Sequence, residues 1–151
     1  MDNHLEAERW MKDAGSFFKR AERCFKERDW QGSIQNSQLA IELSAKALIS
    51  LFEEPEWTHN PHAQFKRIIE DRRKEIEKIF GSDFFNELYA IIEEIKKSSP
   101  WHGWCIYGKE DEDGKWISAV DLCTEDIARN LFESARRCFT VIEKFLKGVK
   151  G

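Results

Sequence analysis

The sequence predicts an all-α protein: an antiparallel up-and-down helical bundle of about five helices, with one long irregular loop before the last helix. Apolar residues recur at steps of three, four and seven over most of the chain, as on the buried face of a helix. The 151 residues include only 3 Pro and 8 Gly, so few positions favour turns. A chain of this length fits one domain, and we expect that domain to span residues 1–151.

The stretch 33–52 is expected to be the central helix. Its two neighbouring apolar rows are Ile34, Ile41, Ala45, Leu48 and Phe52, and Leu39, Leu43, Ala47 and Leu51. A helix that is apolar around so much of its surface packs on several sides. Its polar residues Gln38, Glu42 and Lys46 then lie in a seam. Lys46 is expected to extend to solvent, and an intersubunit contact and a nucleotide pocket remain as alternatives.

The other helices follow from the same periodicity. They are expected near residues 5–28, 65–80, 84–95 and 124–149. The break between the first two helices is short, so these helices should pack as an antiparallel hairpin, with Asp29 as the N-cap of the second. Gly81 is placed to end the third helix, Ser82 or Asp83 to cap the fourth, and Thr124 to cap the last.

Residues 100–123 have no clear period and are expected to form the long loop. This segment holds three of the six tryptophans, and its runs 104–107 and 115–120 could pair as a small hairpin. Trp104 and Tyr107 could stack on a nucleotide ring. Aromatic residues in a long loop more often fold back onto the core or form a protein interface.

The composition indicates an ordinary cytoplasmic protein. The 24 Lys+Arg and 28 Asp+Glu give a formal net charge of −4, so the whole-chain charge does not indicate nucleic-acid binding. No segment is apolar for long enough to span a membrane, and the N-terminus lacks the pattern of a signal peptide. The four cysteines are expected to be free thiols, although a bond between Cys105 and Cys123 remains open.

Three stretches of the chain resemble a HEPN domain (higher eukaryotes and prokaryotes nucleotide-binding), as found in stand-alone archaeal and bacterial HEPN proteins. The first two helices carry AERWMKDAGSFFKRAERCFKERDW and SIQNSQLAIELSAKALISLF. The loop after them carries EPEWTHNP, and the C-terminal part reads IYGKEDEDGKWISAVDLCTEDIARNLFESARRCFTVIEKFLK. The resemblance implies an up-and-down bundle that is usually a homodimer.

The resemblance also implies where an active site would lie. Many HEPN proteins are metal-independent RNases with an Arg-x4–6-His motif in the final helix. The histidines of this chain are His4, His59, His62 and His102, so the final helix has none, and none has an arginine five to seven residues before it. No catalytic residue is therefore predicted, and the pattern favours a protein that is not an enzyme.

Candidate ligand-binding residues come from several parts of the chain: Arg129, Arg136, Arg137, His59, His102, Lys46, Trp104 and Tyr107. The arginines could hold a phosphate, but a solvated face balanced by acidic neighbours is the simpler interpretation. The pairs His59-x2-His62 and His102-x2-Cys105 are of types that zinc accepts. Because nothing in the sequence brings the two pairs together, no metal and no cofactor is predicted.

The function that these observations favour is a catalytically degenerate HEPN-like module associated with a nucleotide or RNA. By resemblance, its partner would be a minimal nucleotidyltransferase in a toxin–antitoxin-like pair. One alternative is a metal-independent RNase with a relocated acid/base, drawn from His59 or His102 and a final-helix arginine. Another is a purely structural bundle that binds other proteins.

Overall fold

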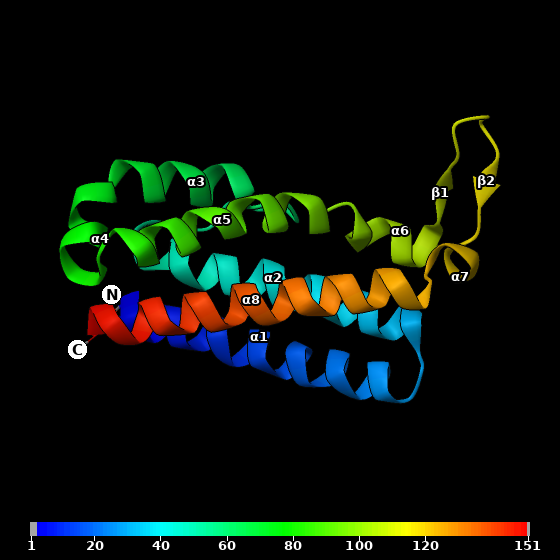
Figure 1. The fold of residues 1–151 in the computed structure, drawn as a ribbon, viewed down its shortest axis with the longest axis horizontal. Helices are drawn as coiled ribbons and strands as arrows, with labels where there is room; N and C mark the ends of the chain where they lie inside the picture. Colours follow the sequence, from blue (N-terminus) through cyan, green and yellow to red (C-terminus); the bar gives the residue numbers. More distant parts are fainter. Residues whose placement is uncertain (1–2, 151) are drawn as a thin grey trace.

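A computed structural model describes residues 3–150, and its longest helices run side by side (Figure 1). These helices are α1 (Asn3–Lys26), α2 (Trp30–Ser50) and α8 (Glu125–Lys150). A second group of helices lies above α8 in the view of Figure 1: α3 (His62–Asp71), α4 (Arg73–Phe80) and α5 (Ser82–Ser98). One end of the molecule holds α6 (Trp101–Tyr107), strands β1 (Lys109–Glu110) and β2 (Trp116–Ile117), and α7 (Ala119–Leu122). The predicted all-α bundle is confirmed.

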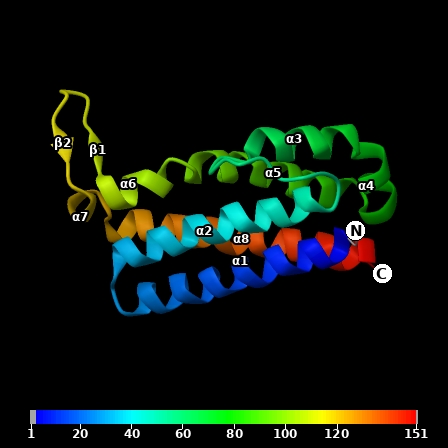
Figure 2. The same ribbon diagram turned by 180° about the vertical axis from the view of Figure 1, so that it is seen from behind.

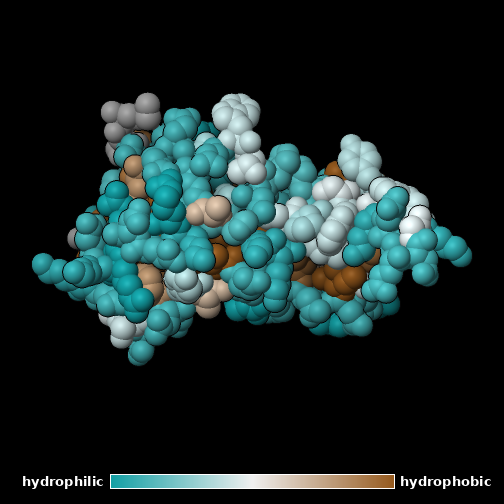
Figure 3. Space-filling model, turned by 90° about the horizontal axis from the view of Figure 1, so that it is seen from above, coloured by the Kyte–Doolittle hydropathy of each residue, from teal (hydrophilic) through white to brown (hydrophobic). Residues whose placement is uncertain are grey.

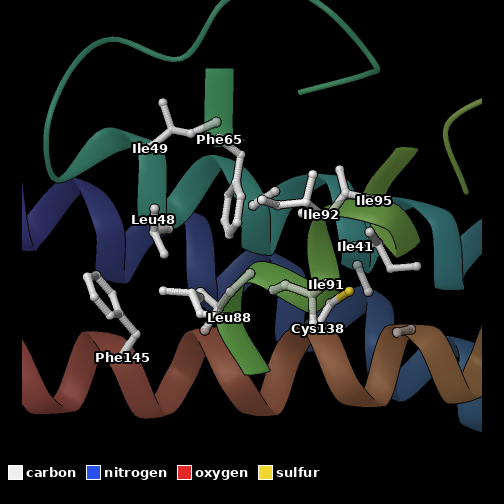
Figure 4. Close-up of a cluster of buried hydrophobic side chains, with 14 of the residues drawn as sticks. Ile41, Leu48, Ile49, Phe65, Leu88, Ile91, Ile92, Ile95, Cys138 and Phe145 are labelled. Carbon is white, nitrogen blue, oxygen red and sulfur yellow. The ribbon is translucent and has the colours of Figure 1, made fainter. Parts of the chain in front are cut away.

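Helix α2 is the centre of the fold, as its apolar width predicts. It contacts α1, α3, α5, α6 and α8, and nearly all of its residues after Asn36 are buried. Figure 4 shows side chains from α2, α3, α5 and α8 meeting in the core, among them Leu48, Phe65, Leu88 and Phe145. Each of these four is at most 1% exposed. The outer surface seen in Figure 3 is mostly hydrophilic, with hydrophobic residues visible mainly in hollows.

Helix α1 packs against α2 through small residues. Its buried residues are Ala7, Ala14 and Ala21, which are spaced by seven and so share one face. Alanine lets two helix backbones approach closely, and the Ser33 hydroxyl donates to the backbone oxygen of Ala21 at 3.1 Å. The predicted cap is also confirmed, because the Asp29 carboxylate accepts from the backbone N–H of Gly32 at 2.9 Å.

The structure corrects two details of the middle helices. The predicted third helix is divided at Arg72, whose φ of −109° separates α3 from α4. No Gly or Pro marks this break, and the Arg72 guanidinium stacks on the Phe52 ring at 4.3 Å, a contact from a distant part of the chain. Gly81 does end α4, but it is also the N-cap residue of α5, so the predicted cap by Ser82 or Asp83 is wrong.

The predicted long loop is more regular than expected. Residues 104–107, which the sequence allowed as a strand, belong to α6, and the hairpin pairs Lys109 with Ile117 and Glu110 with Trp116. The turn is closed by Asp111, whose carboxylate accepts from the backbone N–H groups of Asp113 and Lys115 at 2.9 Å each. Thr124 caps α8 as predicted, accepting from the N–H of Ile127 at 3.3 Å.

Gly108 joins α6 to this hairpin, and its replacement should loosen the junction. Its φ is +77°, and a Cβ there would lie 2.0 Å from the backbone oxygen of Ile117. We expect Gly108→Ala to lower the free energy of unfolding by about 1–3 kcal/mol, because the backbone must shift and the left-handed conformation is strained. Gly103→Ala is the matched control, since a Cβ at that position would have no other group within 4 Å. Urea denaturation of both variants measures the difference, and equal midpoints would contradict it.

All four cysteines are free thiols, so the alternative of a bond between Cys105 and Cys123 is not observed. Burial raises the pKa of Cys105 to about 11, with Cys123 close by, and burial also raises the pKa of Cys138. These thiols are therefore protonated and unreactive at neutral pH. No helix within residues 3–150 is long and apolar enough to cross a membrane.

Candidate functional site

A row of buried polar residues lies on one face of α2. Gln38, Glu42 and Lys46 are spaced by four, so their side chains follow one another along the helix. The Lys46 ammonium lies 3.2 Å from Glu42 Oε2, and the Gln38 amide donates to Glu42 Oε1 at 3.1 Å. Glu42 is only 5% exposed and Lys46 only 8%. The expectation that Lys46 extends to solvent is therefore wrong: it forms a buried ion pair.

Two histidines complete this cluster from outside α2. His59 Nδ1 lies 3.3 Å from Glu42 Oε1. His102 Nδ1 lies 3.9 Å from the same oxygen and 3.1 Å from Gln38 Oε1. The two imidazole rings stack with their centroids 3.6 Å apart. We call Gln38, Glu42, Lys46, His59 and His102 the carboxylate–histidine cluster.

The segment 51–61 carries His59 to the cluster. Figure 2 shows that this segment doubles back alongside α2 and α5 before α3 begins. Its far end is held by Ser99, whose hydroxyl donates to Asn60 Oδ1 at 2.7 Å. Its middle is held by Gln64, whose side chain accepts from the N–H of Glu56 at 3.0 Å and donates to the backbone oxygen of Glu54 at 2.9 Å. His59 is thus placed by bonds on both sides of it in the chain.

The hydrogen bonds also indicate which His102 nitrogen carries the proton. Because the Gln38 amide nitrogen donates to Glu42, the Gln38 oxygen is left as an acceptor, and His102 Nδ1 must donate to it. Burial lowers the pKa of His102, and the neighbouring His59 acts in the same direction. His102 is therefore neutral at pH 7, with its lone pair on Nε2 in this arrangement.

A cavity of about 740 Å³ opens beside the cluster, between α1, α2 and the segment after α2. Its volume is in the usual range for a small-molecule site. Trp10 from α1 and Trp57 from the loop contribute to its walls, and Trp57 is fully exposed. The charged residues of the lining are Glu6, Glu42, Glu53, Glu54 and Glu56 against Arg9 and Lys46. The cavity is therefore acidic.

The sequence-predicted site residues divide into three groups in the structure. Lys46, His59 and His102 meet in the cluster. The three arginines lie on the surface of α8 and pair with carboxylates: Arg129 with Glu125 and Asp126, Arg136 with Glu133, and Arg137 with Glu94. Within residues 3–150, none of these arginines lines the acidic cavity. The simpler interpretation of the arginines, a balanced solvated face, fits these contacts.

Trp104 and Tyr107 lie elsewhere, at the base of the hairpin. They line a hollow of about 380 Å³ together with Trp116, whose indole N–H donates to the backbone oxygen of Tyr107 at 2.8 Å. The Lys109 ammonium stacks on the Trp104 ring at 4.2 Å. Tyr107 is 73% exposed and does not fold back onto the core, whereas Trp104 is half-buried and packs edge to face with Trp101, which contacts the core.

Sequence reasoning missed the cavity and the central place of Glu42 in the site. The four-residue spacing of Gln38, Glu42 and Lys46 is visible in the sequence, but their meeting with His102, 64 positions after Gln38, is not. Trp10 and Trp57 have no feature in the sequence that marks them as cavity walls. His62 stays outside the cluster, with its Nδ1 2.6 Å from Asn60 Oδ1.

The fold and site define a helical-bundle protein with a buried carboxylate and two histidines beside an acidic cavity. The family model of the HEPN domain matches residues 7–149, which is nearly the whole chain. The chain therefore belongs to the HEPN family, as the sequence resemblance predicted. No curated protein and no solved structure matches it.

Proposed function

We propose that the chain is a cytoplasmic, catalytically degenerate HEPN module that binds a nucleotide or a short RNA in the acidic cavity. The observation that carries this proposal is the cavity itself, about 740 Å³ in volume with Trp10 and Trp57 in its walls. An exposed tryptophan can stack on any nucleobase. The missing Arg-x4–6-His motif favours binding over cleavage.

The charge of the cavity indicates which part of the ligand would enter. Five carboxylates face two basic side chains in the lining, so a phosphate group would meet net repulsion there. Carboxylates instead accept hydrogen bonds from the amino groups of adenine, cytosine and guanine. A nucleobase would therefore occupy the cavity, and phosphates would remain outside it. Binding should then depend only weakly on salt, unlike binding that is dominated by phosphate contacts.

Calorimetric titration of the full chain tests this function. Adenosine, guanosine, ATP, GTP and a short single-stranded RNA should be compared in the presence of EDTA. We expect Trp57→Ala to weaken binding by roughly 5- to 150-fold, because one base–aromatic stack is worth about 1–3 kcal/mol. Trp116→Ala is the matched control, since Trp116 is 63% exposed but lies in the other hollow. No binding of any of these ligands at about 1 mM, a free energy weaker than about −4 kcal/mol, would contradict the proposal.

A second candidate function is RNA cleavage by a relocated acid/base pair. The stacked rings of His59 and His102 favour it, since histidine is the commonest proton carrier in catalysis. Two features favour binding instead: centroids 3.6 Å apart leave no room for a phosphate between the rings, and the arginines of α8 pair with carboxylates. Metal-free cleavage of single-stranded RNA that is lost in His59→Ala or His102→Ala would establish the nuclease.

The resemblance to HEPN proteins supports a proposal about the partners of the module. We propose that it forms a homodimer and that a minimal nucleotidyltransferase, encoded beside it as in a toxin–antitoxin-like pair, is its protein partner. Sedimentation of the purified chain tests the homodimer. Co-purification with the product of the neighbouring gene tests the nucleotidyltransferase partner. A chain that sediments as a monomer would contradict the proposed homodimer, and the absence of a nucleotidyltransferase gene nearby would contradict the proposed partner.

A further inference from the structure

We propose that Glu42, His59 and His102 bind a divalent transition-metal ion, with zinc as the best match. Their donor atoms are one carboxylate oxygen and two imidazole nitrogens, and all lie within 4.8 Å of one another. Two histidines and one carboxylate are a donor set of zinc sites that keep one position open. This proposal does not rest on the proposed function, because the three donors are present whether or not the cavity binds a nucleotide.

The donor atoms of Glu42 and the two histidines are nearly as far apart as ligand atoms around a bound ion. Glu42 Oε1 lies 3.3 Å from His59 Nδ1 and 3.9 Å from His102 Nδ1. Ligands about 2.0–2.1 Å from a tetrahedral ion are roughly 3.3–3.5 Å apart, so the carboxylate and His102 need to approach by only a few tenths of an ångström. The stacked rings must also turn. The nitrogen lone pairs of two parallel imidazoles point in planes side by side, whereas ligands of one ion must point toward the same position. The His59 side chain is 63% exposed and can make this turn.

The three donors are carried by two helices and by a segment that hydrogen bonds hold in place. Glu42 projects from the central helix α2 and His102 from α6, while the segment carrying His59 is fastened by Asn60 and Gln64. Such support limits the reorganisation that binding requires. Binding through His102 Nδ1 also requires its proton to move to Nε2 and the Gln38 amide to turn.

The chemistry of the donors selects the ion. Imidazole nitrogen suits zinc, copper, nickel and iron, whereas magnesium and calcium prefer sites made wholly of oxygen. The Lys46 ammonium, 3.2 Å from Glu42 Oε2, repels any cation held at Oε1 and so weakens the site. Glu42 and His59 also line the cavity, so the open position of the ion would be reachable by water or by a ligand from the cavity.

Zinc and cobalt titrations of the full chain after treatment with EDTA test the site. We expect one Zn²⁺ per chain by calorimetry, and visible absorption of low-coordinate Co²⁺ that zinc displaces. His59→Ala and His102→Ala should each lower the affinity by roughly tenfold or more, since loss of even a supporting residue costs about 10- to 100-fold. His62→Ala is the matched control and should bind as the wild type does, because His62 contacts Asn60 instead.

Lys46→Met gives a result that a purely structural role of the cluster would not produce. Removing the ammonium should raise zinc affinity by roughly tenfold, because one unit of like charge near the ion is lost. Zinc should also raise the Tm of the wild type and not that of His59→Ala. The His59 side chain is 63% exposed, so we expect this variant to fold as the wild type does. No binding at about 100 μM free zinc, or equal affinity in wild type and both histidine variants, would overturn the proposal. Neither outcome would affect the nucleotide titrations, which are made in EDTA.

Discussion

Glu42→Ala is expected to lower the free energy of unfolding by about 3–5 kcal/mol, because it leaves the buried Lys46 ammonium without its partner. Lys46 is 8% exposed, and its ammonium forms an ion pair with the Glu42 carboxylate. The substitution also removes the oxygen that accepts from the Gln38 amide. Urea denaturation at pH 7 in the presence of EDTA measures the change. Lys46→Met should lower the free energy of unfolding by less than Glu42→Ala does, because Glu42 then still accepts the Gln38 hydrogen bond and still lies beside the two histidines.

The chain contains a matched control for this substitution. Glu143 and Lys147 are also four residues apart on a helix and lie 3.5 Å apart, but their side chains are 44% and 76% exposed. Water screens such a pair, so Glu143→Ala should change the free energy of unfolding by at most about 0.5 kcal/mol. If the two glutamate variants lose the same stability, Lys46 extends to solvent after all, as the sequence alone suggested.

Leu48→Ala is expected to lower the free energy of unfolding by about 2–5 kcal/mol. Leu48 has no exposed surface and lies where α2 meets Phe145 of α8 and Phe65 of α3, so its truncation leaves a cavity that the surrounding helices fill only in part. Chemical denaturation should show a lower midpoint with an unchanged slope.

Leu5→Ala is the corresponding surface substitution. Leu5 is 62% exposed on α1, so the same loss of side-chain atoms should change stability by less than about 0.5 kcal/mol. Near-equal losses for Leu48→Ala and Leu5→Ala would mean that α2 is not the centre of the core.

Most of the fold could be predicted because its signals are local. The period of the apolar residues reports which face of each helix is buried, and Asp29 and Thr124 act as caps within three residues of their own position. The break at Arg72 could not be predicted, since it accompanies a contact with Phe52, twenty residues earlier in the chain. Helix α6 was missed because seven residues between Pro100 and Gly108 are too few to show a helical period.

The candidate site was predictable only in part, for the same reason. Gln38, Glu42 and Lys46 share one helix, so their spacing indicates that they meet. His59 reaches them because the segment after α2 doubles back and is fastened to Ser99, and His102 reaches them because α6 packs against α2. No local pattern encodes either arrangement. Sequence reasoning could name these histidines as candidates, but it could not place them against the same carboxylate.

Ala7 is buried on α1 between Glu6 and Arg9, two residues that line the acidic cavity, so its small side chain lets α1 lie close to α2 at the cavity. Under the proposed function, selectivity for ligand size would therefore reside partly in a residue that no ligand touches. A bulkier residue at position 7 would then widen the cavity while every residue of its wall stayed the same.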